Sequence, residues 1–157
     1  MNEIQFAYQH YCKKRFPLPS ERQVADLESR IEVGLPPDFR QYILEFNGGW
    51  FNEPRITPGP NGCPADRLSY LSGIGASHRC AELASPADLA LFDDNRPMQI
   101  LPIGYTLMGN LLLLVVASDG TDRGHILLKK AFSDQSFFLA DGIVDFFKLL
   151  QSPSEDQ

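Results

Sequence analysis

The apolar positions of residues 34–50, GLPPDFRQYILEFNGGW, follow the spacing of a helix. The residues at i, i+3, i+4 and i+7 are Phe39, Tyr42, Ile43 and Phe46. This spacing predicts a short helix with one buried face. Pro37 suits the first helical position, and Asn47–Gly49 suits a left-handed cap at the end. Trp50–Phe51 then starts a first strand, so a buried helix leads directly into a sheet.

Four further helices are predicted from the same kind of pattern, over residues 3–15, 20–33, 85–92 and 141–150. In the first, the cations at residues 13–15 complement the negative helix end. The second opens with a capping box formed by Ser20 and Gln23, and Gly34 closes it. The fourth opens near Asp141 and packs its apolar face at the end of the chain.

The second half of the chain is dominated by strand patterns separated by turn residues. Expected strands cover residues 50–51, 55–57, 68–71, 98–103, 111–117, 125–132 and 136–139. The run LLLLVVA at 111–117 is apolar at every position, which indicates a central strand covered on both faces. Residues 52–66 contain four prolines and two glycines and are expected to be a surface loop. Helices first and strands grouped later predict an α+β domain with a mostly antiparallel or mixed sheet.

Length and charge set the broad limits. The 157 residues suit one domain, expected over 1–151, with a disordered tail over 152–157. The net charge is −6, and residues 50–157 hold thirteen acids and eight bases, or −5 of it. This balance disfavours nucleic-acid binding and favours a basic protein partner, although mild acidity also serves solubility alone. The oligomeric state stays open.

The remaining composition points to a cytoplasmic protein. Three irregularly placed cysteines do not form a disulfide framework and suit a reducing compartment. The first sixteen residues lack the apolar run of a secretory signal. The longest apolar run, residues 111–117, is far shorter than the roughly 20 residues of a membrane span, so no membrane partner is expected.

Candidate chemistry is sparse. A Cys–His pair is available in principle among the residues Cys12, Cys63, Cys80, His10, His78 and His125. The segment 78–80 holds the tightest cluster but offers no third orienting group. A zinc site from Cys63, His78 and Cys80 lacks a fourth ligand and the usual paired spacing. No phosphate loop, dinucleotide fingerprint or HExxH helix is present. No metal, cofactor or catalytic residue is therefore predicted, and a small cysteine-dependent hydrolase is the weakest alternative.

Four segments together resemble the SUKH superfamily. They are LPPDFRQYILEFNGG at 35–49, ILPIGYTLMGNLLLLVV at 100–116, GHI at 124–126 and FFLADGIVDFFKLL at 137–150. Their order and spacing match the family's helix, its Gly-Asn turn before a buried strand, and its closing strand and helix. The chain departs from the pattern at Thr106, where many members carry an acid. The resemblance implies a single SUKH-like α+β domain.

The resemblance also implies a non-catalytic role. Many bacterial members are immunity proteins that bind and block a toxin, often a nuclease. An acidic inhibitor is suited to electrostatic steering toward a basic nuclease, and occlusion of the active site is the expected mechanism. A regulatory or scaffold module without a toxin partner is the alternative.

Candidate contact residues are exposed aromatics and loop acids. For Trp50, core packing is the favoured interpretation and a binding hot spot the alternative. Tyr105, with Met108 in the same turn, is either a contact residue or a cover for the sheet edge. Asp93 and Asp94 form one acidic candidate. Asp119 and Asp122 form the other, and for both pairs a solvated turn is the competing interpretation.

Overall fold

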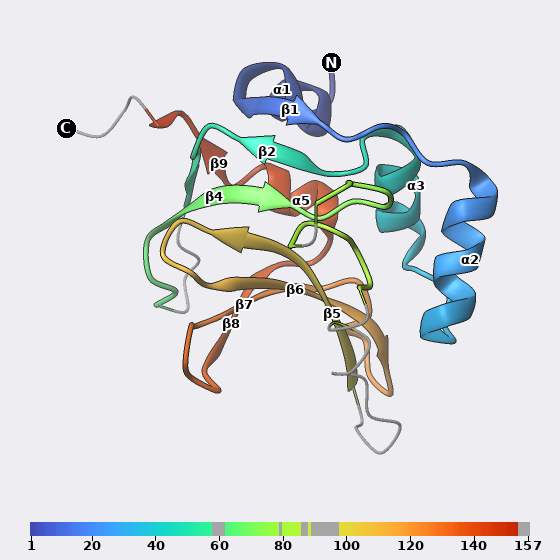
Figure 1. The fold of residues 1–157 in the computed structure, drawn as a ribbon. Helices are drawn as coiled ribbons and strands as arrows, with labels where there is room; N and C mark the ends of the chain where they lie inside the picture. Colours follow the sequence, from blue (N-terminus) through green and yellow to red (C-terminus); the bar gives the residue numbers. More distant parts are fainter. Residues whose placement is uncertain (58–61, 79, 86–87, 89–97, 154–157) are drawn as a thin grey trace.

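The computed structural model describes residues 1–57, 62–78, 80–85, 88 and 98–153 (Figure 1). The helices are α1 (Glu3–Tyr11), α2 (Glu21–Ile31), α3 (Pro37–Glu45) and α5 (Ile143–Phe147). The strands are β1 (Cys12–Arg15), β2 (Gly49–Phe51), β3 (Arg55–Ile56), β4 (Asp66–Leu71), β5 (Met98–Thr106), β6 (Leu111–Ser118), β7 (Ile126–Lys129), β8 (Ser136–Ala140) and β9 (Leu150–Gln151). The described strands form one sheet in the order β1-β2-β4-β5-β6-β7-β8, and β3 lies between β4 and β9. These strand pairs are antiparallel, which confirms the predicted α+β fold.

The first helix is shorter than the sequence predicts. It ends at Tyr11, and residues 12–15 form β1 at the edge of the sheet, paired with β2. The prediction of a helix over 3–15 was therefore wrong in its last turn. Pairing with β2 gives this backbone hydrogen-bond partners, and it places the Arg15 guanidinium over the rings of Tyr8 and Phe46, 5.2 and 5.3 Å from their centroids.

The ends of α2 and α3 are close to those predicted. Ser20 and Gln23 form the capping box at the start of α2. Its end is set by Glu32, which adopts φ 60°, rather than by Gly34. Pro37 is the first residue of α3, as predicted. Beyond α3, Asn47 with φ 56° and Gly48 with φ 72° turn the chain into β2, which confirms the left-handed cap.

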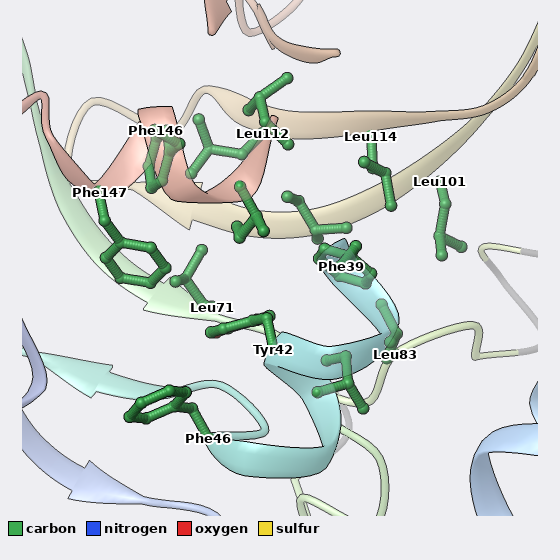
Figure 2. Packing of buried hydrophobic residues seen from close by; sticks show 14 of the residues in the cluster. Phe39, Tyr42, Phe46, Leu71, Leu83, Leu101, Leu112, Leu114, Phe146 and Phe147 are labelled. Carbon is green, nitrogen blue, oxygen red and sulfur yellow. The ribbon is translucent and has the colours of Figure 1, made fainter. Parts of the chain in front are cut away.

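The core lies between the helices and one face of the sheet. Figure 2 shows Phe39 and Tyr42 of α3, and Phe46 directly after this helix, in one cluster with sheet residues such as Leu71 and Leu112 and with Phe146 and Phe147 of α5. All four apolar positions predicted for the buried face of this helix are buried, which confirms the prediction. The hydroxyls of Tyr8 and Tyr42 lie 2.8 Å apart inside this core, so α1 and α3 share a buried polar contact.

The later elements differ from prediction mainly in length. The strand expected over 125–132 covers only 126–129. The closing helix stops at Phe147, because Leu150 pairs with Ile56 and so becomes part of strand β9. The Leu149 carbonyl also accepts from the Thr57 backbone N–H at 2.9 Å. The helix predicted over 85–92 lies outside the described residues except at Ser85 and Asp88, whose side chains each accept from the other's backbone N–H.

The two faces of the sheet have different surroundings. On the helix side, Leu112, Leu114 and Val116 of β6 join the main core. The opposite face, called the outer face here, carries the alternate residues of β6. Leu113 and Val115 are buried there as well, so this part of the central strand is covered on both sides, as predicted. Another part of the outer face is covered by Ala76 and Ala81, which pack with Phe16, Trp50 and Tyr70.

Candidate functional site

An aromatic row crosses the outer face from β2 to β5. The strand register places Trp50 opposite Tyr70 and Tyr70 opposite Tyr105. The Trp50 and Tyr70 rings lie 5.0 Å apart, and the Tyr70 and Tyr105 rings stack at 5.9 Å with planes 10° apart. The register continues from Tyr105 to Leu111 of β6 and Lys129 of β7. Two of the predicted contact residues, Trp50 and Tyr105, are therefore joined through Tyr70.

The row is covered at one end and open at the other. Trp50 is half-buried and lies edge-on to Phe16 and His78, at 6.3 and 5.1 Å. The Tyr70 hydroxyl donates to the Cys80 carbonyl at 3.1 Å, and burial raises the pKa of Tyr70 to about 12. Tyr105 is 37% exposed. Trp50 thus packs at the covered end of the row, while Tyr105 is partly exposed to solvent at the other end.

Large apolar side chains continue from Tyr105 into two neighbouring turns. Leu107 and Met108, in the β5–β6 turn, are 52% and 68% exposed, and Phe132 in the β7–β8 turn is fully exposed. We call Tyr105, Leu107, Met108 and Phe132 the apolar tip. Exposed apolar groups gathered in one place are typical of interaction sites in soluble proteins, whereas single ones are not.

A buried hydrogen-bond network holds the two turns in place. Oδ1 of Asp66 accepts from the backbone N–H of Met108 at 3.1 Å, and its Oδ2 accepts from the Asn110 amide at 2.7 Å. Oδ1 of Asn110 accepts from the backbone N–H of Ala131 at 2.9 Å. The backbone N–H of Asn110 donates to the Thr106 hydroxyl at 3.0 Å. Asp66 and Asn110 are 5% and 6% exposed. Because both side chains are buried and fully engaged, they fix the turns that display Met108 and Phe132.

Two hollows border the apolar tip. The β3–β4 hollow, of about 330 Å³, is lined by Arg55, Ile56, Thr57, Ala65, Asp66, Arg67, Leu107, Met108 and Gln151. The β7 hollow, of about 150 Å³, is lined by Tyr105, Gly109, Leu111, Lys129, Lys130, Ala131 and Phe132. The larger hollow is at the lower end of the roughly 300–1,000 Å³ found for ligand pockets. Each hollow therefore combines apolar walls with two basic side chains.

The acidic candidates are not part of this surface. Asp119 and Asp122 follow the last residue of β6, whereas Leu107 and Met108 of the apolar tip precede its first residue. At about 3.3 Å per residue, the eight-residue strand puts roughly 20 Å or more between the two turns. Asp122 accepts from the Ser118 hydroxyl at 2.5 Å, which lowers the pKa of this carboxyl and ties it into its own turn. Asp93 and Asp94 lie outside the described residues.

Two of the three cysteine thiols are poorly suited to act as nucleophiles. Burial raises the pKa values of the Cys12 and Cys63 thiols, which disfavours the reactive thiolate. Nδ1 of His78 accepts from the backbone N–H of Cys80 at 3.3 Å, so this ring atom faces the backbone of Cys80. Among the described residues, no group of three or more His, Cys, Asp and Glu side chains is arranged to hold a metal ion. Nor does this part of the chain contain a helix with the length and apolar composition needed to cross a membrane.

The sequence predicted Tyr105 and Met108 as candidate contact residues, but not Leu107, Phe132 or the buried residues that support the turns. Phe132 lies in the segment AFSDQS, where one aromatic residue among small and polar ones was the available signal. Asp66 and Asn110 carried no signal of their own, because Asp66 bonds to residues 42 and 44 positions further along the chain and Asn110 also bonds to Ala131, 21 positions further along.

The fold and this surface define a single α+β domain with its helices on one sheet face and an exposed apolar tip beside the other. The model of the SMI1/KNR4 family (SUKH-1) matches residues 18–149. The chain belongs to this family, which confirms the resemblance drawn from its motifs. The family is generally non-enzymatic, and membership is consistent with an immunity-type protein. No curated protein and no solved structure matches the chain.

Proposed function

We propose that this chain is a non-catalytic immunity protein that binds a cognate bacterial toxin domain and blocks its active site. Membership of the SUKH-1 family supports a protein partner of this kind. The observation that carries the proposal is the apolar tip, in which Tyr105 at the end of β5 and three side chains on the adjoining turns reach solvent, and a buried network fixes these turns.

The chemistry of the tip suits a protein interface. Tyrosine, phenylalanine and methionine are enriched at such interfaces, and a few such residues carry most of the binding free energy. Because Asp66 and Asn110 already fix the turns, little loop entropy is lost when a partner binds. Met108 and Phe132 also contribute nothing to either core cluster, so packing does not explain their presence.

Inhibition in this proposal is stoichiometric. The tip makes the closest contacts, and the bulk of the domain covers the entrance to the toxin's active site. Trp50 acts indirectly, by supporting the rings of Tyr70 and Tyr105. Asp119 and Asp122 lie at the opposite end of β6 from Leu107 and Met108, so in this proposal they act mainly by long-range electrostatic steering.

The test is co-expression with the C-terminal domain of a toxin-like protein encoded beside this gene, scored by cell survival and recovery of a one-to-one complex. The double variant Met108→Asp/Phe132→Asp is expected to abolish rescue, because it puts charge at the centre of the interface. The matched control is Phe6→Asp/Leu18→Asp, which changes two exposed apolar residues elsewhere, 44% and 56% exposed.

Three results test the immunity function and the assignment of the apolar tip as the binding surface. Rescue by the unchanged chain and the control, but not by the tip variant, supports the proposal. Equal rescue by both variants contradicts the assignment of the tip. A chain that neither rescues nor binds any neighbouring toxin domain refutes the immunity function and favours a regulatory module. Melting curves of all variants separate lost binding from lost folding.

A further inference from the structure

Among the described strands, three lie at a free edge of the sheet. They are β1 and β8, at opposite ends of the strand order (Figure 1), and β9, which pairs with β3 alone. β1 carries Lys13, Lys14 and Arg15, and a bulge interrupts its register with β2. β9 contains only two residues. Cations, bulges and short length each discourage the addition of another strand, so both of these edges are protected.

The edge formed by β8 lacks this protection over its first three residues. Its sequence, SFFLA, contains no charged residue and no proline. It pairs with β7 in regular register from Ser136 to Phe138, and the irregularity in this pairing lies after Phe138. Ser136 is exposed and Phe138 is half-buried, whereas Leu139 and Ala140 are buried. The open part of this edge is therefore residues 136–138.

The hydrogen-bond pattern directs backbone groups of β8 toward its open side. Just before β8, the backbone N–H of Lys130 donates to the Gln135 carbonyl at 2.9 Å. In an antiparallel ladder, bonded and non-bonded pairs alternate along the strands. Phe137 is therefore bonded to β7, whereas Ser136 and Phe138 direct their N–H and C=O groups away from it. Among the described residues, neither of the two has a hydrogen bond to a group outside the β7–β8 pair.

We infer that β8 accepts a strand of the toxin domain, which extends the sheet beside the apolar tip. This inference rests on the proposed function and specifies how the partner binds. Phe132 of the tip lies four residues before Ser136 in the same hairpin, so one partner surface can contact both. When a strand is added to a sheet edge, main-chain hydrogen bonds supply affinity and alternate side chains supply specificity.

The side chains of β8 indicate the chemistry of the added strand. Phe137 packs against the main core, and Phe138 lies on the outer face with its ring 5.1 Å from that of His125. Aromatic and β-branched residues pair well with such rings across strands. Asp141, which follows β8, lies 3.5 Å from Nε2 of His125 and keeps 77% of its side chain exposed. The favoured segment therefore has β-branched or aromatic residues at its centre and a Lys or Arg beside Asp141.

Charge disfavours a second copy of this chain as the occupant. In an antiparallel pair of β8 strands, Ser136 of one copy would bond to Phe138 of the other. Asp134 would then lie opposite Ala140 of that copy and beside its Asp141. Two-fold symmetry would repeat this contact, so the dimer would hold two pairs of like charges across the edge. A toxin segment with a basic end avoids this repulsion.

The first measurement is amide hydrogen exchange of the labelled chain, alone and with the toxin domain encoded beside this gene. In the free chain, the amide of Phe137 is expected to exchange slowly and those of Ser136 and Phe138 to exchange fast. In the complex, the amides of Ser136 and Phe138 are expected to exchange at least about tenfold more slowly. Slow exchange at these two positions in the free chain overturns the inference, because the edge is then already covered.

The second measurement compares binding of the toxin domain to three variants. Ser136→Pro removes one N–H from the open edge and leaves the pairing with β7, because proline is tolerated where the N–H faces solvent. Phe138→Lys puts a cation on this edge, as in β1, and the matched control Phe6→Lys makes the same change on α1, at a residue 44% exposed. Each β8 variant is expected to bind about tenfold more weakly, and the control as the unchanged chain does. Melting curves identify a variant that does not fold, and the other β8 variant then decides.

The outcomes separate this inference from the proposed function. Weaker binding of the β8 variants, with protection of the Ser136 and Phe138 amides, supports it. Equal binding of the unchanged chain and the β8 variants overturns it and leaves the immunity function intact. A wild-type dimer that Ser136→Pro dissociates also overturns it, because the occupant is then a second copy of the chain.

A peptide measurement covers the case in which no toxin domain binds. The probes are the heptapeptide Lys-Thr-Val-Thr-Val-Thr-Lys and its counterpart with every interior backbone N–H methylated, which cannot pair as a strand. The readout is the amide resonances of Ser136 and Phe138 in the labelled chain. Shifts with the first peptide only support strand addition at β8 even though the immunity function has failed. Equal shifts with both peptides, or none with either, overturn it.

Discussion

Replacing Asn47 tests the contact that joins the end of α3 to the segments that follow β1 and β4. This side chain is fully buried. Its Nδ2 donates to the carbonyls of Pro17 and Ile74, at 2.7 and 2.8 Å, and its Oδ1 accepts from the Ile74 backbone N–H at 2.8 Å. The backbone of Asn47 is left-handed, with φ 56°.

Two substitutions separate the side chain from the backbone. Asn47→Gly removes three hydrogen bonds but tolerates the left-handed conformation, and at about 0.5–1.5 kcal/mol each this costs about 1.5–4.5 kcal/mol. Asn47→Ala removes the same bonds and adds about 1–2 kcal/mol, because its Cβ disfavours left-handed backbone. The alanine variant is therefore expected to be the less stable of the two.

The assay is urea unfolding followed by the fluorescence of Trp50, the single tryptophan of the chain. Its ring lies beside the segment that Asn47 ties down, so it reports on both local and global loss of structure. A cost under about 1 kcal/mol for both variants would refute the role of this contact. Equal stability of the two variants would refute the left-handed strain alone.

Two further predictions concern stability. Phe46→Ala is expected to destabilise by about 3–5 kcal/mol in urea melts, because the ring is 7% exposed and lies 4.7 Å from that of Tyr8, while Phe132→Ala should change stability by less than about 0.5 kcal/mol. Burial raises the pKa of Tyr70 from 10.0 to about 12, so its contribution to stability is complete below pH 10 and is lost as the pH rises toward 12. Tyr70→Phe should flatten this loss in melts over that pH range, and an unchanged slope would contradict the assignment.

The sequence predicted the helices and strands correctly where the residues at their ends and the spacing of their apolar residues indicate the same element. Pro37 and the Asn47–Gly49 segment mark the ends of α3, and the helical spacing between them marks its buried face. It failed where long-range pairing decides. Residues 12–15 became a strand because β2 lies beside them, and Leu150 became part of β9 because β3 lies beside it. Neither neighbour is visible in a local pattern.

The candidate site was only partly predictable for a related reason. Trp50 and Tyr105 were chosen as conspicuous aromatics, and the register does place both on one face. The acids were chosen for their charge and their loops, but a loop position gives no information about which end of the sheet it occupies. The network of Asp66 and Asn110 depends on contacts between distant segments, which only the folded arrangement reveals.

In and beside the β5–β6 turn, some residues stabilise the backbone and their neighbours are exposed to solvent. Gly104 must lack a side chain, because a Cβ would lie 2.7 Å from the Tyr70 carbonyl oxygen, and Gly109 adopts φ 84°. Asn110 supplies the buried amide that ties both turns together. Changing these residues disturbs the fold, whereas Leu107 and Met108 face solvent and can be replaced at little cost in stability. A domain built this way can change its partner preference by changing the displayed side chains while the supporting residues keep the turn in place.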